Sequence, residues 1–155
     1  MIKKIVLTTL ILLPLLTLYF YMSRASSENI KNLPFKYESS DEFFSAINKH
    51  RTSIGVPALI YDEKLCPLAK KRVETLKDVD WDKLGHYKFE EDANAYAVDT
   101  RPLQENIGRG PNLPTIIDGL LNSKGHREAI ESKVNVYTCV ATDNKNLFVQ
   151  IFAGY

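Results

Sequence analysis

Two histidines and one glutamate are the side chains best suited to chemistry in this sequence, and each stands beside a glycine or an asparagine. The three motifs are Gly85-His86, Glu105-Asn106 and the segment Ser123-Lys124-Gly125-His126-Arg127. Glycine allows backbone turns that other residues resist, and asparagine side chains often bind nearby backbone. We therefore expect both imidazoles and the carboxylate to converge on one cleft.

Two kinds of chemistry are open to such a cleft. Neutral imidazoles bind zinc, so His86 and His126 are candidate ligands for a divalent metal. A histidine that titrates near neutral pH also transfers protons, which makes His86, Glu105 and His126 candidate catalytic groups. Glu105 can instead orient a metal-binding histidine. In the alternative interpretation, each histidine only holds its own loop in place.

Other features of the sequence bear on hydrolysis. The chain lacks both His-Glu-x-x-His and Gly-x-Ser-x-Gly motifs. Ser123 lies three residues before His126, but proximity in sequence does not establish a nucleophile with its base. The third histidine, His50, matches no motif, and we predict that it lies on the surface. Helix spacing leaves open whether Asp118 and Glu128 face the cleft.

The composition is that of an ordinary globular domain. The 155 residues are 45% hydrophobic and 25% charged. The formal net charge is +1, but three basic and no acidic residues lie in the first 25, which leaves −2 for the remainder. A nucleic-acid-binding protein would show a basic face, so we do not expect a nucleic-acid partner.

The N-terminus has the pattern of an export signal or a membrane anchor. Lys3 and Lys4 precede the uncharged run 5–22, and Ser23-Arg24-Ala25 places small residues at the spacing that signal peptidase reads. The run is long for a signal core and short for a membrane span, so residues 1–25 are predicted to be a hydrophobic helix, either cleaved or kept as an anchor. The positive-inside rule places the rest of the chain outside the cytosol, secreted or anchored, and only this segment would contact a membrane.

A polar linker, residues 26–38, and one domain, residues 39–155, are predicted to follow. The spacing of apolar residues predicts helices at 41–54, from 62 or 66 to 76, and at 114–122, with a further turn at 126–131. Asn48 and Arg51 lie one turn apart on the first helix, where we assign them to a solvated face. The charged segment 78–100 is predicted to be irregular but packed through its aromatic residues.

The last part of the domain is predicted to be a β-hairpin. Residues 134–141 and 147–152 are rich in Val, Ile, Phe and Tyr, and residues 142–146 favour a turn. Both strands are apolar at odd and at even positions, which is typical of a sheet covered on both faces. Helices followed by a hairpin indicate an α+β fold.

Two cysteines, Cys66 and Cys139, leave two interpretations open. In an oxidising compartment they can form one disulfide that ties the second helix to the first hairpin strand. The alternative is two separate small core residues.

Six motifs in order along the chain resemble those of the CAP superfamily of cysteine-rich secretory, antigen 5 and pathogenesis-related 1 proteins, in its short bacterial form. They are Asn48-x-x-Arg51 with Gly55, Pro57 and Leu59; Leu65 with Ala69 and Arg72; Gly85-His86; Glu105-Asn106-Ile107; Ser123-x-Gly-His126-Arg127; and Phe148-Val149-Gln150-x-Phe152. There are departures: Ser123 stands where the eukaryotic branch has glutamate, Leu120 where tryptophan is usual, and the acidic run Glu90-Glu91-Asp92 has no counterpart.

The resemblance implies a three-layer α-β-α sandwich and a cleft formed by His86, Glu105, Asn106, Ser123 and His126. In some members the two histidines bind a divalent metal such as zinc. The resemblance also implies a non-enzymatic binding module, secreted or membrane-anchored, for a lipid, an envelope component or a protein. A metal- or histidine-dependent hydrolase of peptidase type is the alternative, and a purely structural envelope protein is a third interpretation.

Overall fold

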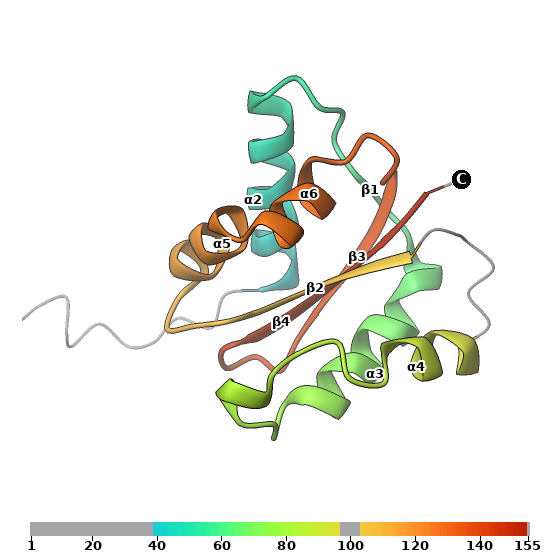
Figure 1. The fold of residues 1–155 in the computed structure, drawn as a ribbon. Helices are drawn as coiled ribbons and strands as arrows, with labels where there is room; N and C mark the ends of the chain where they lie inside the picture. The colour runs from blue at the N-terminus through green and yellow to red at the C-terminus, as the bar shows by residue number, and fades with distance from the viewer. Residues whose placement is uncertain (1–38, 97–102, 155) are drawn as a thin grey trace, which may run out of the picture. The chain divides into compact units, whose positions relative to one another are not determined.

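A mixed four-stranded sheet with helices on both faces forms the part of the chain that this computed structural model describes, residues 39–96 and 103–154 (Figure 1). The strands are β1 (Ile60–Tyr61), β2 (Leu103–Arg109), β3 (Tyr137–Thr142) and β4 (Leu147–Ala153), in the spatial order β1-β3-β4-β2. Only β1 and β3 pair in parallel. The predicted hairpin is confirmed as β3 and β4.

The N-terminal segments, residues 1–25 and 26–38, lie outside the described residues, so the predicted signal or anchor and the linker stay predictions. Within residues 39–96 and 103–154, every helix is too short or too polar to cross a membrane.

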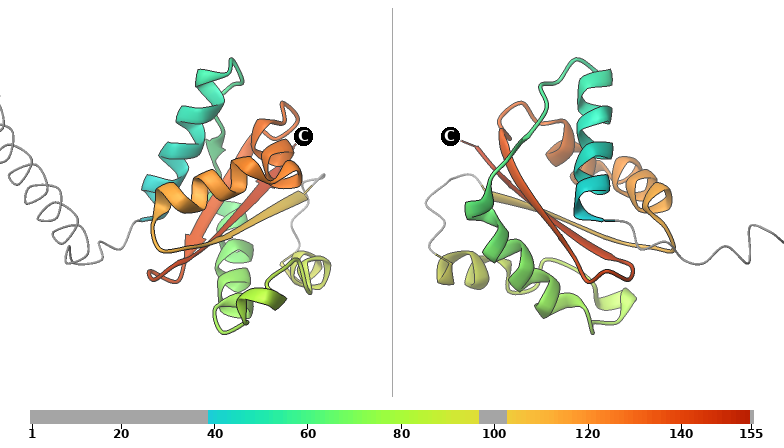
Figure 2. Two further views of the ribbon diagram at one scale, coloured as in Figure 1. Left: turned by 60° about the vertical axis from the view of Figure 1, so that its left-hand side comes forward. Right: turned by 180° about the vertical axis from the view of Figure 1, so that it is seen from behind.

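The helices form two layers, one on each face of the sheet (Figures 1 and 2). One layer holds α2 (Ser40–Ser53), α5 (Leu113–Asn122) and α6 (Lys124–Glu131), and the other holds α3 (Cys66–Leu76) and α4 (Phe89–Ala95). Side chains of β4 alternate between them: Leu147, Val149 and Ile151 pack with the α3 core, and Phe148 and Phe152 with the α2–α5–α6 core. The predicted α+β fold is confirmed, and its layers are those of an α-β-α sandwich.

The ends of the helices show how local sequence sets their limits. Helix α2 begins at Ser40, one residue earlier than predicted, after a capping box between Ser39 and Glu42. Both starts predicted for the next helix are present. Asp62 caps a 3₁₀ turn, η1 (Glu63–Leu65), and α3 then begins with Pro67 in its first turn, where a missing donor costs nothing.

The prediction of a solvated face for Asn48 and Arg51 is wrong. Arg51 is 1% exposed, and its guanidinium donates to the backbone carbonyls of Pro57, Ile130, Ser132 and Asn135. Asn48 donates to the carbonyl of Leu59 and accepts from its amide. These two side chains replace the hydrogen bonds that irregular backbone would otherwise make with water, which is why polar residues lie on the inner face of α2.

The segment predicted to be irregular contains two helical elements, η2 (Trp81–Lys83) and α4. Helix α4 escaped prediction because it lacks an apolar stripe: its buried residues are Ala93 and the charged Asp92. Strand β2 was also missed, because polar residues occupy positions that the fold buries, Glu105 and Asn106 among them.

A disulfide joins Cys66 at the start of α3 to Cys139 in β3, with Cα atoms 5.3 Å apart. The disulfide interpretation of the two cysteines therefore holds in the structure. Because the bridge lies between a helix and the central hairpin, it fixes the α3 layer to the sheet.

Removing this bridge is expected to lower the free energy of unfolding. The bridged residues are 73 positions apart, and the chain-entropy model assigns about 4 kcal/mol to a loop of this length. Urea unfolding followed by circular dichroism, with and without dithiothreitol, measures the loss. The variant with both Cys66→Ser and Cys139→Ser is the control, because dithiothreitol must leave its midpoint unchanged. A wild-type urea midpoint that is the same with and without dithiothreitol would contradict the presence of the disulfide.

Candidate functional site

Strand β2 organises the site because its side chains alternate between the two helical layers. Glu105 and Arg109 reach α3: Glu105 binds Arg72, and Arg109 donates to the carbonyls at the C-terminal end of α3. Asn106 points the other way and donates to the backbone carbonyl of His126 in α6, 3.1 Å away. The motif Glu105-Asn106 thus fixes one layer with each of its side chains.

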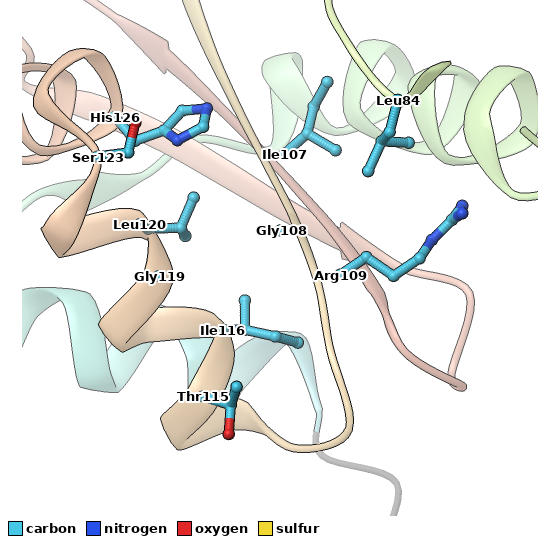
Figure 3. A pocket seen from close by; sticks show the side chains of 10 residues that line it. All are labelled: Leu84, Ile107, Gly108, Arg109, Thr115, Ile116, Gly119, Leu120, Ser123 and His126. Atoms are coloured by element: carbon cyan, nitrogen blue, oxygen red, sulfur yellow. The ribbon is translucent and has the colours of Figure 1, made fainter. Parts of the chain in front are cut away.

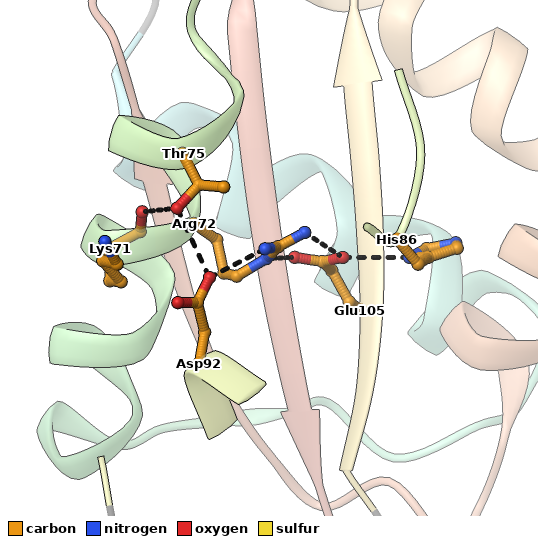
Figure 4. Close-up of polar contacts among 6 residues, drawn as sticks. All are labelled: Lys71, Arg72, Thr75, His86, Asp92 and Glu105. Carbon is orange, nitrogen blue, oxygen red and sulfur yellow. Dashed lines mark hydrogen bonds and ion pairs between the residues drawn. The ribbon is translucent and has the colours of Figure 1, made fainter. Parts of the chain in front are cut away.

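Glu105 is the centre of a buried ion cluster (Figure 4). Arg72 Nε lies 2.6 Å from Glu105 Oε1, and Arg72 Nη1 lies 2.8 Å from Asp92 Oδ2. Thr75 adds a contact to Asp92 at 3.3 Å. Burial lowers the pKa of Arg72, but the hydrogen bonds and charges of Glu105 and Asp92 outweigh it and raise the pKa overall. Arg72 therefore stays charged, and both carboxylates are matched to it.

His86 lies at the outer end of this cluster. Its Nδ1 is 2.9 Å from Glu105 Oε2, and its side chain is 54% exposed. Arg72, Glu105 and His86 lie in a row from the α3 layer outwards (Figure 4). Because an ionised carboxylate only accepts hydrogen bonds, Nδ1 is the nitrogen assigned the proton. Nε2 is then left as the atom of His86 that can accept a proton or bind a ligand.

His126 faces His86 from the opposite layer. It lies on α6, and the two ring centroids are 6.2 Å apart with an interplanar angle of 60°. Burial lowers the pKa of His126, and the nearby His86 lowers it further. His126 is therefore a neutral imidazole at neutral pH, with one nitrogen able to accept.

The five residues expected in the cleft line a single cavity of about 370 Å³: His86, Glu105, Asn106, Ser123 and His126. The exposed Glu90 of α4 and the partly buried Phe89 also line it. We refer to this cavity as the cleft.

A second cavity, of about 470 Å³, continues along β2 from the cleft (Figure 3). Its floor is formed by Ile107, Gly108 and Arg109, and its walls by Leu84 on one side and residues of α5 and α6 on the other. The wall residues of α5 and α6, with the serine between them, are Thr115, Ile116, Gly119, Leu120, Ser123 and His126. We refer to this largely apolar cavity as the groove. Ser123 and His126 line both cavities.

A glycine at position 108 allows this arrangement. A Cβ added there would stand 2.4 Å from Cγ2 of Ile116, closer than atoms can approach. Because Ile116 is branched at Cβ, that methyl group cannot swing away without a change of rotamer. Gly108 therefore lets α5 pack against β2 and sets the position of the groove wall.

The donor set falls short of a complete metal site. Structural and catalytic zinc sites use three or four protein ligands. Among the described residues, no three His, Cys, Asp or Glu side chains lie close enough together to hold an ion. Both Glu105 oxygens already bind Arg72 and His86. A carboxylate behind a histidine is common at metal sites, but the described residues offer two imidazoles and no third ligand.

The remaining titratable candidates lie outside the cleft. His50 is partly buried rather than fully on the surface, and its Nε2 is 2.9 Å from Glu131 Oε1, which links α2 to α6. Asp118 lines a separate pocket between α2 and α5. Glu128 is exposed, 3.9 Å from Lys124.

Asp92 is the site residue that the sequence did not reveal. It belongs to the acidic run 90–92, for which the motif comparison offered no counterpart. On α4, Asp92 shares the helical face of Phe89, which packs against the core, but the segment has no apolar stripe that would predict this helix from the sequence.

The lowered pKa of His126 predicts a pH-dependent stability. Between the folded pKa and the ordinary value of 6.5, the unfolded chain binds the proton and the folded chain does not. The free energy of unfolding is therefore expected to fall as the pH drops below about 6.5. Ring titrations by NMR measure the pKa directly. His86→Gln should raise the pKa of His126, and a His126 pKa at or above 6.5 in the wild type would contradict the burial.

Comparisons with known proteins identify the fold and the family. Solved structures with the same fold include an extracellular protein containing an SCP domain from Bacillus anthracis (20% identity, TM-score 0.66) and an outer surface protein of Borrelia burgdorferi (22%, 0.63). A cysteine-rich secretory protein from Staphylococcus aureus is 16% identical with a TM-score of 0.66. The matches cover 75%, 76% and 75% of this chain, and 40%, 96% and 38% of those proteins, respectively.

The chain thus spans well under half of the Bacillus and Staphylococcus proteins. A search among curated proteins gave no significant match. The family model for the cysteine-rich secretory protein family, CAP, matches residues 44–152, which include every residue of the cleft. The chain therefore belongs to the CAP family of cysteine-rich secretory proteins.

Proposed function

We propose that this chain is an extracytoplasmic binding module that holds a lipid, an envelope component or a protein in its cleft without converting it. The observation that carries the proposal is the continuity of the cleft with the groove through Ser123 and His126. A ligand with both polar and apolar parts finds imidazoles and apolar side chains side by side. Pockets of this composition are typical of binding sites.

The environment of Glu105 supports binding over catalysis. Its side chain is fully buried, and its oxygens accept from Arg72 and His86, so it holds His86 in place and is not free to act on a ligand. A hydrolase also needs a nucleophile activated by a base. Among the described residues, no hydroxyl or thiol hydrogen-bonds to the ring of His86 or of His126.

The extracytoplasmic location has three supports. The N-terminal residues have the pattern of an export signal or an anchor. The similar structures include an extracellular protein and an outer surface protein. The disulfide between Cys66 and Cys139 is of the kind that persists in an oxidising compartment.

The binding proposal predicts that 8-anilinonaphthalene-1-sulfonate, an anionic amphiphile, binds the protein saturably. Ser123→Trp is expected to abolish binding, because Ser123 lines both cavities, while Lys124→Trp at the next, exposed position serves as the matched control. Fluorescence titration and the ligand-induced rise in melting temperature measure the effect. Equal binding by wild type and Ser123→Trp, or none by either, would count against the proposal.

A hydrolase is the second candidate, favoured by the hydrogen bond between His86 and Glu105, which resembles a base with its orienting carboxylate. If zinc takes part, His86 and His126 are the residues that would hold it.

We expect zinc to bind weakly, because only two protein ligands are present. Calorimetric titration should show this binding lost in the double variant His86→Ala/His126→Ala and kept in His50→Ala. We also expect no cleavage of casein with or without zinc. Cleavage that His126→Ala abolishes, in a variant that remains folded, would establish the hydrolase instead.

A further inference from the structure

Strand β2 leaves one of its two edges unpaired among the described residues. It is the outermost strand of the sheet, next to β4 on one side only. The amide of Gly110 donates to the carbonyl of Asn146, in the register that pairs Gly108 with Phe148. In an antiparallel pair, alternate residues bond to the partner strand and the others point away. The backbone groups of Glu105, Ile107 and Arg109 therefore face outwards, away from β4.

These outward groups open into the groove. Ile107 and Arg109 belong to its floor, between Leu84 on one side and Ile116 and Leu120 on the other (Figure 3). An unpaired strand edge is a template for another extended chain, which then lies about 4.8 Å away. The backbone edge can supply hydrogen bonds, and the apolar walls on both sides can contact the side chains of an added strand.

The charges along the groove favour an anionic end on the occupant. Arg109 is the only fully charged side chain among the lining residues, and no carboxylate lines the groove. Its Nη1 and Nη2 donate to the carbonyls of Leu76, Lys77 and Val79, and its Nε is buried without a hydrogen-bond partner. No described carboxylate forms an ion pair with Arg109, so its positive charge is not neutralised by one. His126, at the other end, is neutral at neutral pH because burial lowers its pKa. The groove is thus an apolar channel with one cation at one end.

We propose that the groove binds an extended apolar peptide segment with a free C-terminal carboxylate, which adds as a strand along the outer edge of β2. The backbone of Ile107 and Arg109 pairs with the peptide, its side chains lie between α5 and Leu84, and its carboxylate lies toward Arg109. This assignment rests on the proposed binding function and narrows its ligand to a peptide.

Gly119 offers a way to block the groove without disturbing the fold. It lines the groove from α5, and a Cβ added there meets no atom within 4 Å. Within a helix, replacing glycine with leucine favours the helical state. Gly119→Leu is therefore expected to place a side chain in the groove without destabilising α5. Asp118→Leu is the matched control, because it adds the same side chain at the neighbouring exposed position, which lines the pocket between α2 and α5 instead.

The test selects binders for the purified protein from a random heptapeptide library with free C-termini. A selected peptide is expected to bind wild type and Asp118→Leu alike and to lose at least about tenfold in affinity to Gly119→Leu. Amidation of its C-terminus should weaken binding by about tenfold as well, because a charge-assisted interaction is lost. Only every second amide of the peptide pairs with β2. N-methylation of that set of amides should therefore abolish binding, and N-methylation of the other set should not.

Hydrogen exchange gives a readout that does not depend on any variant. The amides of Ile107 and Arg109 should become protected when the selected peptide is bound, and those of α2 should not. Protection elsewhere, or equal binding by Gly119→Leu, would overturn the proposal.

Two further outcomes separate the peptide from the general binding function. If no peptide is selected but hexadecanoate binds wild type and not Gly119→Leu, the ligand is an acyl chain: the peptide proposal fails and the binding module stands. If neither peptides nor hexadecanoate bind, and the anionic amphiphile also fails, both proposals fall.

Discussion

The ion pair between Arg72 and Glu105 is the interaction on which the rest of the site depends. It joins α3 to β2 in the protein interior, where neither side chain is exposed to water. A buried charge pair of this kind adds little stability over apolar residues, but removal of one partner costs about 3–5 kcal/mol because the other is left uncompensated. The pair therefore acts chiefly by fixing the positions of side chains rather than by stabilising the fold. It fixes Glu105, and Glu105 fixes the ring of His86.

Buried arginines serve two different purposes in this fold. Arg72 meets carboxylates and positions a site, whereas Arg51 meets only backbone carbonyls and fixes the chain around α2 and after α6. The planar guanidinium suits both tasks because it presents several donors in a fixed geometry. The two arginines differ in their acceptors, which are carboxylates for Arg72 and backbone carbonyls for Arg51.

The sequence was most informative where burial follows periodicity. The hairpin, α5 and the capped start of α2 were predictable because their apolar residues recur at strand or helix spacing. Arg51, Asp92 and β2 were not, since each places polar groups inside, and only tertiary partners make that favourable. The members of the cleft were identified as motifs, but their connection to Arg72 and Asp92 and the groove beside them depend on contacts between layers that a single sequence does not encode locally.

Each imidazole of the cleft belongs to a different layer of the sandwich, His86 to the segment that packs with α3 and α4, and His126 to α6. The spacing between the rings therefore follows the spacing between the layers, with the sheet as the shared reference. Core residues outside the cleft, such as those through which α5 packs on β2, therefore help to set the distance between the two rings. A change in the packing of either core would therefore change the distance between the two imidazoles even if both histidines were kept.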